Sequence, residues 1–402
     1  MSFYKSNPLN RMQKPNVLFI SSWYPSKEHP TLGNFVQRHA ESIHPFVNLY
    51  VVYVTSSENI KTDYKIENEI INGVNTTVVY YKKVTSKLPF INAVSKLKRY
   101  RKGYKKGIEF IEEQFKISKF DICHCNVTFP AGLIALELKK KRNIPYIVTE
   151  HWTLFLPYKN DFEKLPFYIK NKMKEIAKNA NKLLPVSQHL ANSMQEKGLE
   201  GDYTIIPNVT ETALFGLKHS DNKEIKQILH VSTLIDDHKN ISGIFEALKA
   251  ISEKRQDFKL LIVSDGDIEL AKKHQNKIGL GEEFVEYHGT KTPREIAEFY
   301  RQSDFFVLFS NYENLPVVMV ESFSCGIPFV SSNVGGISEY VTEENGMLVE
   351  PRNVKQLVNA IDKTLSNLAN YDSIKIRELA IQNFDNKVVG KKYYELYKEI
   401  IE

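Results

Sequence analysis

Short apolar runs rich in β-branched residues alternate with segments of helical period along the chain. In its first half, the runs typical of strands cover residues 17–21, 49–54, 77–81, 121–125, 144–149 and 183–186. Between the fourth and fifth runs lies an amphipathic stretch, AlaGlyLeuIleAlaLeuGluLeuLysLysLys, of the kind that connects parallel strands. This alternation predicts a mostly parallel sheet with helices on both faces.

A polar stretch without periodicity interrupts the alternation, which then restarts. The later runs cover residues 228–232, 259–264, 285–288, 305–309, 328–331 and 347–349. Because 402 residues are also too many for one ordinary core, two domains are expected. The sequence therefore predicts an α/β protein of two Rossmann-like, doubly wound domains. They would cover residues 1–209 and 227–384, joined by a linker at 210–226, and a final helix at 385–402 would pack back onto the first domain. A ligand cleft is expected between the domains, at the carboxyl ends of the strands.

Composition argues against several classes of protein. The 54 Lys and Arg exceed the 48 Asp and Glu by only six charges, which does not demand nucleic-acid binding. Three cysteines do not suit a disulfide framework and favour a reducing compartment. No run of 18 apolar residues occurs, and the first residues do not match a signal peptide. We therefore expect a cytoplasmic protein.

The most informative local motif is SNYENLPVVMVE, in which Glu313 and Glu321 stand eight residues apart across Pro316. Proline is a natural first helical residue, so a helix is expected from there to Gly326. Glu313 would then lie in the preceding loop and Glu321 on the helix, with free backbone N–H groups between them. Such N–H groups suit phosphate, and carboxylates suit paired hydroxyls. The alternative is a pair of solvated surface glutamates.

Other strand-end loops are expected at the same cleft. Gly33 precedes a helix, where backbone can approach a ligand closely. His151 follows the fifth strand and is either structural or catalytic. Lys239 lies on a loop or at a helix start, where it is either solvated or able to neutralise a diphosphate. Gly335 begins a flexible loop that also carries Glu339.

These motifs resemble the family 4 glycosyltransferases, which are retaining enzymes of the GT-B fold. GluAsnLeuProValValMetValGlu matches the family's E-x7-E signature, and the agreement continues through SerPheSerCysGlyIlePro, ValGlyGlyIleSerGluTyrVal and AsnGlyMetLeuValGluPro. In the first half AspIleCysHisCys, ThrGluHisTrp, ProValSer and IleProAsnVal agree more loosely. The resemblance covers nearly the whole chain.

The resemblance implies roles for individual residues. Glu321 would hold the ribose hydroxyls of a nucleotide sugar and Glu313 the hydroxyls of the transferred sugar. His151 would face that sugar or the departing phosphate oxygen. Lys239 would pair with the diphosphate, and Gly33 would let the phosphate approach the first domain. The implied catalytic residues are thus Glu313, His151 and Lys239, and the implied donor-binding residues are Glu321, Gly33, Asn314, Leu315, Thr233 and Gly335.

Two departures from the family pattern and two sequences that resemble metal-binding motifs bear on this assignment. Thr233 stands where the family commonly has a phosphate-binding arginine, and losing such a cation costs about 1.5–3 kcal/mol. The family's glycine-rich strand end is altered to Ser264-Asp265-Gly266-Asp267, which also spells the D-x-D of metal-dependent glycosyltransferases. Its position at a strand end favours a turn. Cys123-His124-Cys125 fits a half-buried strand better than a zinc site. We expect neither a metal nor a cofactor.

The implied function is transfer of a sugar from a UDP- or GDP-linked donor to a saccharide or lipid-linked acceptor, in cell-surface polysaccharide biosynthesis. Two alternatives remain open at this point. One is a nucleotide-sugar epimerase on the same architecture. The other is a non-catalytic partner subunit that binds sugar nucleotides, motivated by Thr233.

The segment from Lys82 to Lys106 carries ten lysines and arginines and no acidic residue. A helix here would be basic on one face and apolar on the other, which suits an anionic membrane surface. The alternative is an ordinary helix of the first domain with a solvated basic face. The membrane hypothesis favours a lipid-linked acceptor at the inner face of the cytoplasmic membrane. Nucleic acid is not expected, because aromatic stacking motifs are missing.

Overall fold

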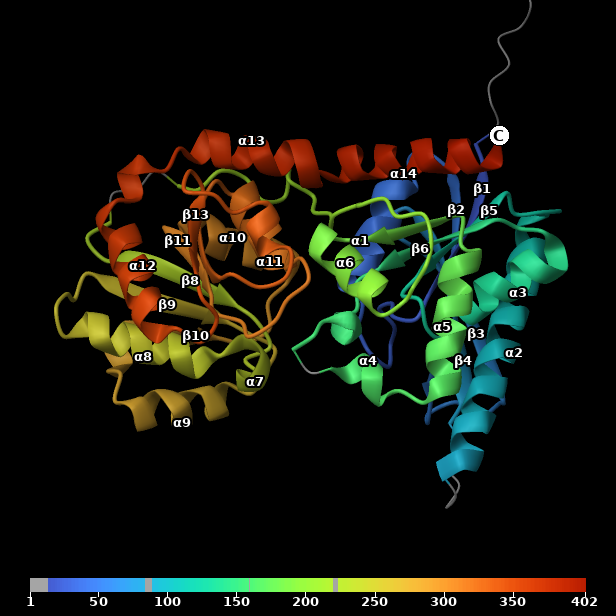
Figure 1. Cartoon of the computed structure of the whole chain (residues 1–402), viewed down its shortest axis with the longest axis horizontal. Coiled ribbons are helices and arrows are strands. Elements are labelled where there is room, and N and C mark those ends of the chain that lie inside the picture. The colour runs from blue at the N-terminus through green and yellow to red at the C-terminus, as the bar shows by residue number, and fades with distance from the viewer. Residues whose placement is uncertain (1–13, 84–88, 159, 220–222) are drawn as a thin grey trace, which may run out of the picture.

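Two α/β units lie side by side in the computed structural model, which describes residues 14–83, 89–158, 160–219 and 223–402 (Figure 1). The first unit is built on a seven-stranded sheet of order β3-β4-β2-β1-β5-β6-β7. Its strands are β1 (Asn16–Ser21), β2 (Asn48–Ser57), β3 (Tyr64–Ile71), β4 (Val74–Lys82), β5 (Ile122–Asn126), β6 (Tyr146–Glu150) and β7 (Lys182–Pro185). All neighbours run parallel except β3 and β4.

Strand β3 was not expected from the sequence. It is an edge strand with only partly buried side chains, so it lacks the continuous apolar run of the inner strands. Asn72 and Gly73 join it to β4 with φ values of 48° and 83°. Two consecutive positive φ angles are typical of a tight hairpin turn, and Asn-Gly is the dipeptide that favours one. The signal for this hairpin was therefore in the sequence.

The second unit is a six-stranded, fully parallel sheet of order β10-β9-β8-β11-β12-β13. Its strands are β8 (Lys226–Val231), β9 (Phe258–Val263), β10 (Val285–His288), β11 (Phe305–Leu308), β12 (Phe329–Ser332) and β13 (Gly346–Val349). Each expected strand of this half is present within two residues of its predicted bounds. The prediction of two doubly wound units is confirmed.

Helices cover both faces of each sheet. The first unit contains α1 (Asn34–Ile43), α2 (Pro89–Phe115), α3 (Gly132–Arg142), η1 (Thr153–Phe155), α4 (Asp161–Lys164), α5 (Phe167–Asn179) and α6 (Gln188–Glu196). The second contains α7 (Asp236–Lys239), α8 (Ile241–Ser252), α9 (Ile268–Ile278), η2 (Glu282–Phe284), α10 (Pro293–Gln302), α11 (Val317–Ser324), η3 (Ile337–Glu339), α12 (Val354–Ser366), η4 (Leu368–Asn370) and α13 (Ser373–Phe384). In the first unit α2, α3 and α5 pack on one face, and α1 packs on the other.

The last helix, α14 (Asn386–Ile401), leaves the second unit after α13 and lies against α1 of the first (Figure 1). Val389, Tyr393 and Tyr397 are fully buried there. This is the segment expected to cross back. In the expected linker, Thr210 bridges to Asp385 at the start of α14, and residues 220–222 lie outside the described residues. Within the described ranges, no helix is both long and apolar enough to span a bilayer.

Candidate functional site

The Glu313–Glu321 motif folds as a loop followed by a helix, as the sequence predicts. Pro316 is the N-cap of α11, and Gly326 follows the helix with a φ of 69°. Glu313 and Glu321 are only 7% and 5% exposed. The alternative of two solvated surface glutamates is therefore wrong. Buried carboxylates need partners, and each of these has them.

Glu313 is held in a cluster of donors from its own unit. Lys239 Nζ lies 2.5 Å from Glu313 Oε1, to which the Ser310 hydroxyl also donates at 2.7 Å. His238 Nε2 lies 3.5 Å from the same oxygen. Burial raises the pKa of Glu313, but the charges of Lys239 and His238 and the hydrogen bonds outweigh it, so the pKa lies below its ordinary value. Glu313 is therefore ionised at neutral pH.

Lys239 is the last residue of the four-residue helix α7, and Asn240 alone separates it from the first residue of α8. Its side chain is 13% exposed. The alternative of a solvated lysine is therefore wrong.

Glu321 is partnered from both units. Arg38 Nη1, on α1 of the first unit, lies 2.8 Å from Glu321 Oε1. This contact is an ion pair without the alignment of a hydrogen bond. The Tyr300 hydroxyl donates to Oε2 at 3.1 Å. The sequence did not indicate Arg38 as a site residue. Its one signal was its position, about one helical turn after Gly33.

His151 follows β6 and is 8% exposed, yet neither ring nitrogen has a hydrogen-bond partner among the described residues. Its ring centroid lies 4.9 Å from that of Phe35 and 5.1 Å from that of His39. Burial, and then the neighbouring His39, lower the pKa of His151 well below its ordinary value. The imidazole is therefore neutral. Two buried, unpaired nitrogens are a costly arrangement that a polar ligand would relieve.

The backbone around His151 is fixed from both units. Glu150, which is fully buried, accepts hydrogen bonds from the backbone N–H groups of His151 and Trp152 at 2.9 and 2.8 Å. From the second unit, Asn314 Nδ2 donates to the His151 carbonyl oxygen at 2.6 Å. This contact brings together two of the residues expected at the cleft.

Two predicted glycines have positive φ angles at close approaches. Gly33 precedes α1 with a φ of 76°, and a Cβ there would lie 2.7 Å from the Trp23 carbonyl carbon. Gly335 has a φ of 61°, and a Cβ there would lie 2.0 Å from the Glu313 carbonyl oxygen. Both positions therefore require glycine.

Further contacts cross between the units at the cleft, and sequence reasoning missed them. Asn208 Nδ2 donates to the Leu315 carbonyl oxygen at 2.6 Å. The Glu339 carboxylate accepts from the N–H groups of Gln188 and His189, at 3.0 and 2.8 Å, at the start of α6. That carboxylate suits the positive end of the helix. The strand-end loops of both units thus converge on one place.

Thr233 lies on the loop that follows β8, six residues before Lys239. It is exposed, and its carbonyl oxygen would lie 1.8 Å from a Cβ on Gly266. Among the described residues, the side-chain hydrogen bonds to Glu313 come from Lys239 and Ser310, not from Thr233. The neighbouring Asp267 caps α9 by accepting from the Leu270 N–H at 2.9 Å. The D-x-D sequence therefore forms a turn and a helix cap.

Cys123 and Cys125 lie in β5, where every residue is buried, so the expected half-buried strand is in fact fully buried. Burial raises the pKa of both thiols. Among the described residues no cluster of three or more His, Cys, Asp or Glu side chains suits a metal ion.

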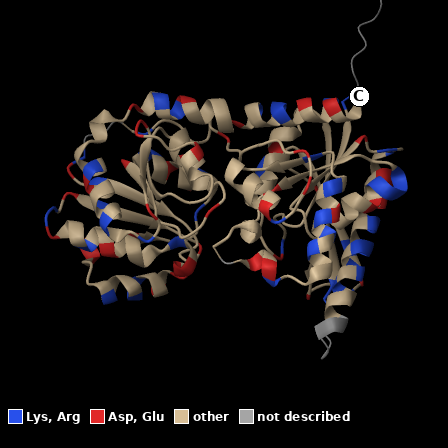
Figure 2. Ribbon diagram, viewed as in Figure 1, with Lys and Arg blue, Asp and Glu red and all other residues tan. Residues whose placement is uncertain are grey.

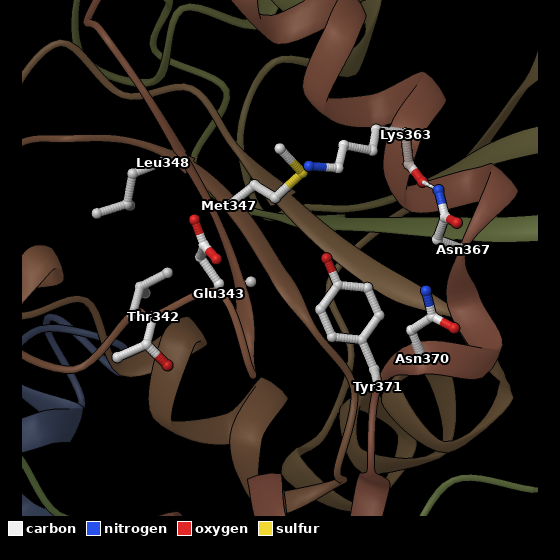
Figure 3. Close-up of a pocket in the computed structure, with 10 residues that line it drawn as sticks. Thr342, Glu343, Met347, Leu348, Lys363, Asn367, Asn370 and Tyr371 are labelled. Atoms are coloured by element: carbon white, nitrogen blue, oxygen red, sulfur yellow. Dashed lines mark hydrogen bonds between the residues drawn. The ribbon is translucent and has the colours of Figure 1, made fainter.

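A separate surface cavity of about 480 Å³ lies on the second unit between β13 and α12. Figure 3 shows Glu343, Met347 and Tyr371 around it. None of the predicted site residues lines this cavity, and several of its side chains, such as Lys363, are exposed. The chemistry of the motifs instead places the candidate site at the cleft.

Two family models match this chain. Residues 51–214 match the model described as Glycosyltransferase Family 4, and residues 217–379 match the model described as Glycosyl transferases group 1. Together they cover most of both units.

Relatives and solved structures point the same way. TuaC of Bacillus subtilis, a proposed teichuronic acid biosynthesis glycosyltransferase, is 24% identical over 380 residues, covering 86% of this chain and 88% of TuaC. Sucrose-phosphate synthase from Thermosynechococcus elongatus has a TM-score of 0.75 at 18% identity, over 96% of this chain and 99% of that structure. Anabaena HepE in complex with UDP-glucose has a TM-score of 0.69 at 16% identity, over 96% and 100%. These similarities favour a transferase over the epimerase and the non-catalytic subunit.

Proposed function

Because this chain belongs to the family 4 glycosyltransferases and has their GT-B fold, we propose that it is a retaining enzyme acting on a nucleotide-diphosphate sugar. It would transfer the sugar to a saccharide or lipid-linked acceptor in cell-surface polysaccharide biosynthesis. One observation carries this proposal. Two buried carboxylates, each paired with a cation, converge with a buried histidine whose ring nitrogens have no hydrogen-bond partner in the part of the chain that the structure describes.

The donor would bind mainly to the second unit. Glu321 on α11 would take the ribose hydroxyls, and Glu313 would take hydroxyls of the transferred sugar, because carboxylates accept strong hydrogen bonds from paired hydroxyls. Lys239 and the free N–H groups at the start of α11 would face the diphosphate. The likeness to a structure that holds UDP-glucose supports a UDP-linked donor, with a GDP-linked donor as the alternative.

The proposed reaction exchanges one bond at the anomeric carbon. The bond from that carbon to the diphosphate oxygen breaks, and a bond to the acceptor hydroxyl oxygen forms on the same face. The acceptor proton passes to the departing phosphate oxygen, and the nucleoside diphosphate leaves. No side-chain nucleophile is required, so the residues act by positioning the reactants and stabilising charge. Neutral His151 would contact the sugar beside this bond. No metal ion enters the proposed step.

The acceptor would approach along the first unit. Trp23, Phe35 and Trp152 are half-buried at the edge of the cleft, and the Trp23 and Trp152 ring centroids lie 5.5 Å apart. Aromatic rings offer flat apolar surfaces with polar surroundings, which suit the apolar face of a sugar ring. Because the Phe35 ring also contacts His151, an acceptor on this surface would reach the donor sugar.

The basic helix α2 would bring the enzyme to an anionic membrane surface at the cytoplasmic face. Figure 2 shows lysines and arginines along α2. The later part of its apolar face is not free, because Tyr100, Tyr104 and Ile108 are buried against the sheet, whereas Val94 and Leu97, nearer the start of the helix, are exposed. Arg99 and Arg101 already pair with Asp63 and Glu137. The proposed contact is mainly electrostatic, and residues 84–88 of this segment lie outside the described residues.

A nucleotide screen tests the proposed function. Thermal melting would be measured with UDP, GDP, ADP and their glucose conjugates, since a ligand at 100 times its Kd stabilises the folded state by about 2.7 kcal/mol. We expect one nucleotide series to raise the melting temperature. Glu313→Gln should then abolish release of the nucleoside diphosphate from the matching sugar nucleotide, whereas Glu343→Gln, outside the cleft, should not. A shift with none of these nucleotides would overturn the proposal.

Vesicle sedimentation tests the membrane contact. The protein should sediment with vesicles containing phosphatidylglycerol and remain in solution with phosphatidylcholine alone, and added salt should reverse the binding. Reversing the charges of Lys102 and Lys106 should abolish it. Binding that is independent of lipid charge would remove the proposal.

A further inference from the structure

Arg38 bridges the two units through an ion pair. It lies on the second turn of α1, and its guanidinium is paired with Glu321 on α11 at 2.8 Å. The two side chains are 26% and 6% exposed. Because the Tyr300 hydroxyl donates to the other oxygen, both carboxylate oxygens of Glu321 are occupied by groups of the protein itself.

This occupation conflicts with the proposed binding of ribose by Glu321. Each carboxylate oxygen can accept two hydrogen bonds, but a hydroxyl that approaches Oε1 must share it with the Arg38 guanidinium, so full donation by two ribose hydroxyls favours release of Oε1 by Arg38. A guanidinium keeps its charge at neutral pH, and a largely buried charge without a partner is strongly destabilising. Arg38 therefore requires another anion within reach when ribose binds.

The donor itself carries such an anion. α1 begins directly after Gly33, so Arg38 lies about one turn from the free N–H groups at that helix start. Glu321 lies about one turn from the start of α11. The N-terminus of each helix favours a negative charge placed near it. A diphosphate would supply that charge.

The other carboxylate of the site, Glu313, is also paired with a cation. Lys239 is paired with Glu313 at 2.5 Å, so each carboxylate of the site is balanced by one cation. If sugar and ribose hydroxyls take the carboxylates, both cations become available to the two negative charges of a diphosphate. The two cations then balance the diphosphate, and the hydroxyls donate hydrogen bonds to the carboxylates.

We propose that Arg38 is a donor-binding residue that exchanges its ion pair with Glu321 for one with the diphosphate of the nucleotide sugar. Arg38 from the first unit and Lys239 from the second then hold the diphosphate from opposite sides. The proposal rests on the proposed function, because it assumes a nucleotide-diphosphate donor in this cleft.

Binding of matched nucleosides and nucleoside diphosphates tests it. Wild-type protein, Arg38→Gln and Arg38→Ala would be titrated with uridine and UDP, guanosine and GDP, and adenosine and ADP. The variants should bind the nucleoside as well as wild type or better, because the competitor for Glu321 is gone. They should bind the diphosphate about 10- to 100-fold more weakly, the effect of one charge-assisted contact. Arg38→Lys should recover part of this loss.

Arg142→Gln is the matched control, since Arg142 pairs with Glu112 away from the cleft and should change neither affinity. Arg38→Gln preserves the side-chain stem if Arg38→Ala does not fold. An unchanged ratio of diphosphate to nucleoside affinity in the Arg38 variants would overturn the Arg38 proposal alone. If wild type binds none of the diphosphates, the proposed function fails and the Arg38 proposal fails with it.

Discussion

At the residue scale, the geometry of the site depends on contacts that leave no space for a side chain. At Gly335 a Cβ would lie 2.0 Å from the Glu313 carbonyl oxygen and 2.8 Å from that of Asn314. Gly336 fixes the same loop by donating its N–H to the Asn314 carbonyl oxygen at 2.6 Å. The position of Glu313 beside Lys239 therefore depends on the missing side chain at residue 335.

Gly335→Ala should reduce the rate of nucleoside diphosphate release from the nucleotide sugar by about 100-fold, the cost of misplacing a reacting group by roughly 1 Å. Gly279→Ala is the matched control, because Gly279 also has a positive φ, 78°, but nothing lies within 4 Å of its Cβ position. Both variants should lose folding stability from the left-handed backbone, and Gly335→Ala should lose more because its Cβ also meets the Glu313 carbonyl oxygen, while only Gly335→Ala loses activity. Equal activities of the two variants would contradict the prediction.

The sequence contained the signals for some site residues and not for others. Glu313 and Glu321 could be placed because Pro316 separates a loop from a helix, and the order of proline, helix and glycine is local chemistry. Arg38 could not, since an ion pair between α1 and α11 depends on how two separately wound units meet. Asn208 is unpredictable for the same reason: its partner, Leu315, is 107 residues away.

At the element scale, α14 joins the two units by packing on α1. Gly390 lies at the closest point, where a Cβ would be 1.9 Å from the Ser42 carbonyl oxygen. A hydrogen bond of 2.6 Å joins the Tyr397 hydroxyl to His124 Nδ1, and one of 3.1 Å joins the Tyr393 hydroxyl to His39 Nδ1. The helix therefore contacts the buried side of the strands that lead to His151.

Gly390→Ala should destabilise the protein by about 1–3 kcal/mol, because the added methyl group must push α14 away from α1. The sign is informative, since alanine in an exposed helix would instead add about 1 kcal/mol of stability. Urea denaturation would measure the change. Lys391→Ala, on the exposed side of the same helix, should have little effect. A stabilised Gly390→Ala variant would mean that the tight contact with Ser42 does not form.

Elements with strong local patterns were predictable and those without were not. The inner strands are continuous apolar runs because both of their faces are buried. The edge strand β3 lacks this pattern, and only the Asn72-Gly73 turn marked it. For α2, the sequence showed an amphipathic helix but not which surface its apolar face covers, since burial of Tyr104 depends on the sheet beneath it.

At the scale of the whole molecule, a buried polar chain runs from α14 to the loop of the candidate site. Tyr397 contacts His124, which contacts Thr149 at 2.7 Å. Thr149 contacts Tyr393 at 3.2 Å, and Tyr393 contacts His39. The chain then continues from His39 to Asn208 at 3.4 Å, and Asn208 donates to the loop of the second unit. Packing of the last helix and position of the site loop are therefore coupled through buried histidines that are uncharged at neutral pH.

The buried histidines of this polar network predict how the stability of the protein depends on pH. Burial lowers the pKa of His39 to about 4, and burial also lowers the pKa values of His124 and His151. The unfolded chain binds protons on these histidines below a pH of about 6.5, and the folded protein does not. The stabilising contribution is therefore fully present above pH 6.5 and is lost as the pH falls toward the folded pKa values. As the pH falls below about 6.5, each histidine should lower the free energy of unfolding by about 1.4 kcal/mol for every pH unit.

Urea denaturation followed by tryptophan fluorescence between pH 7.5 and 5 measures this slope where it arises, because both tryptophans, Trp23 and Trp152, lie in the first unit with the three histidines. This range stays above the ordinary pKa values of carboxylates, about 4, so the histidines dominate the slope. His39→Gln removes one titrating group and should reduce the dependence of the unfolding free energy on pH by the contribution of one histidine. If the free energy of unfolding stays constant down to pH 5, the histidines take up protons in the folded state. The buried histidines, tyrosines and Thr149 then cannot form the hydrogen bonds described above.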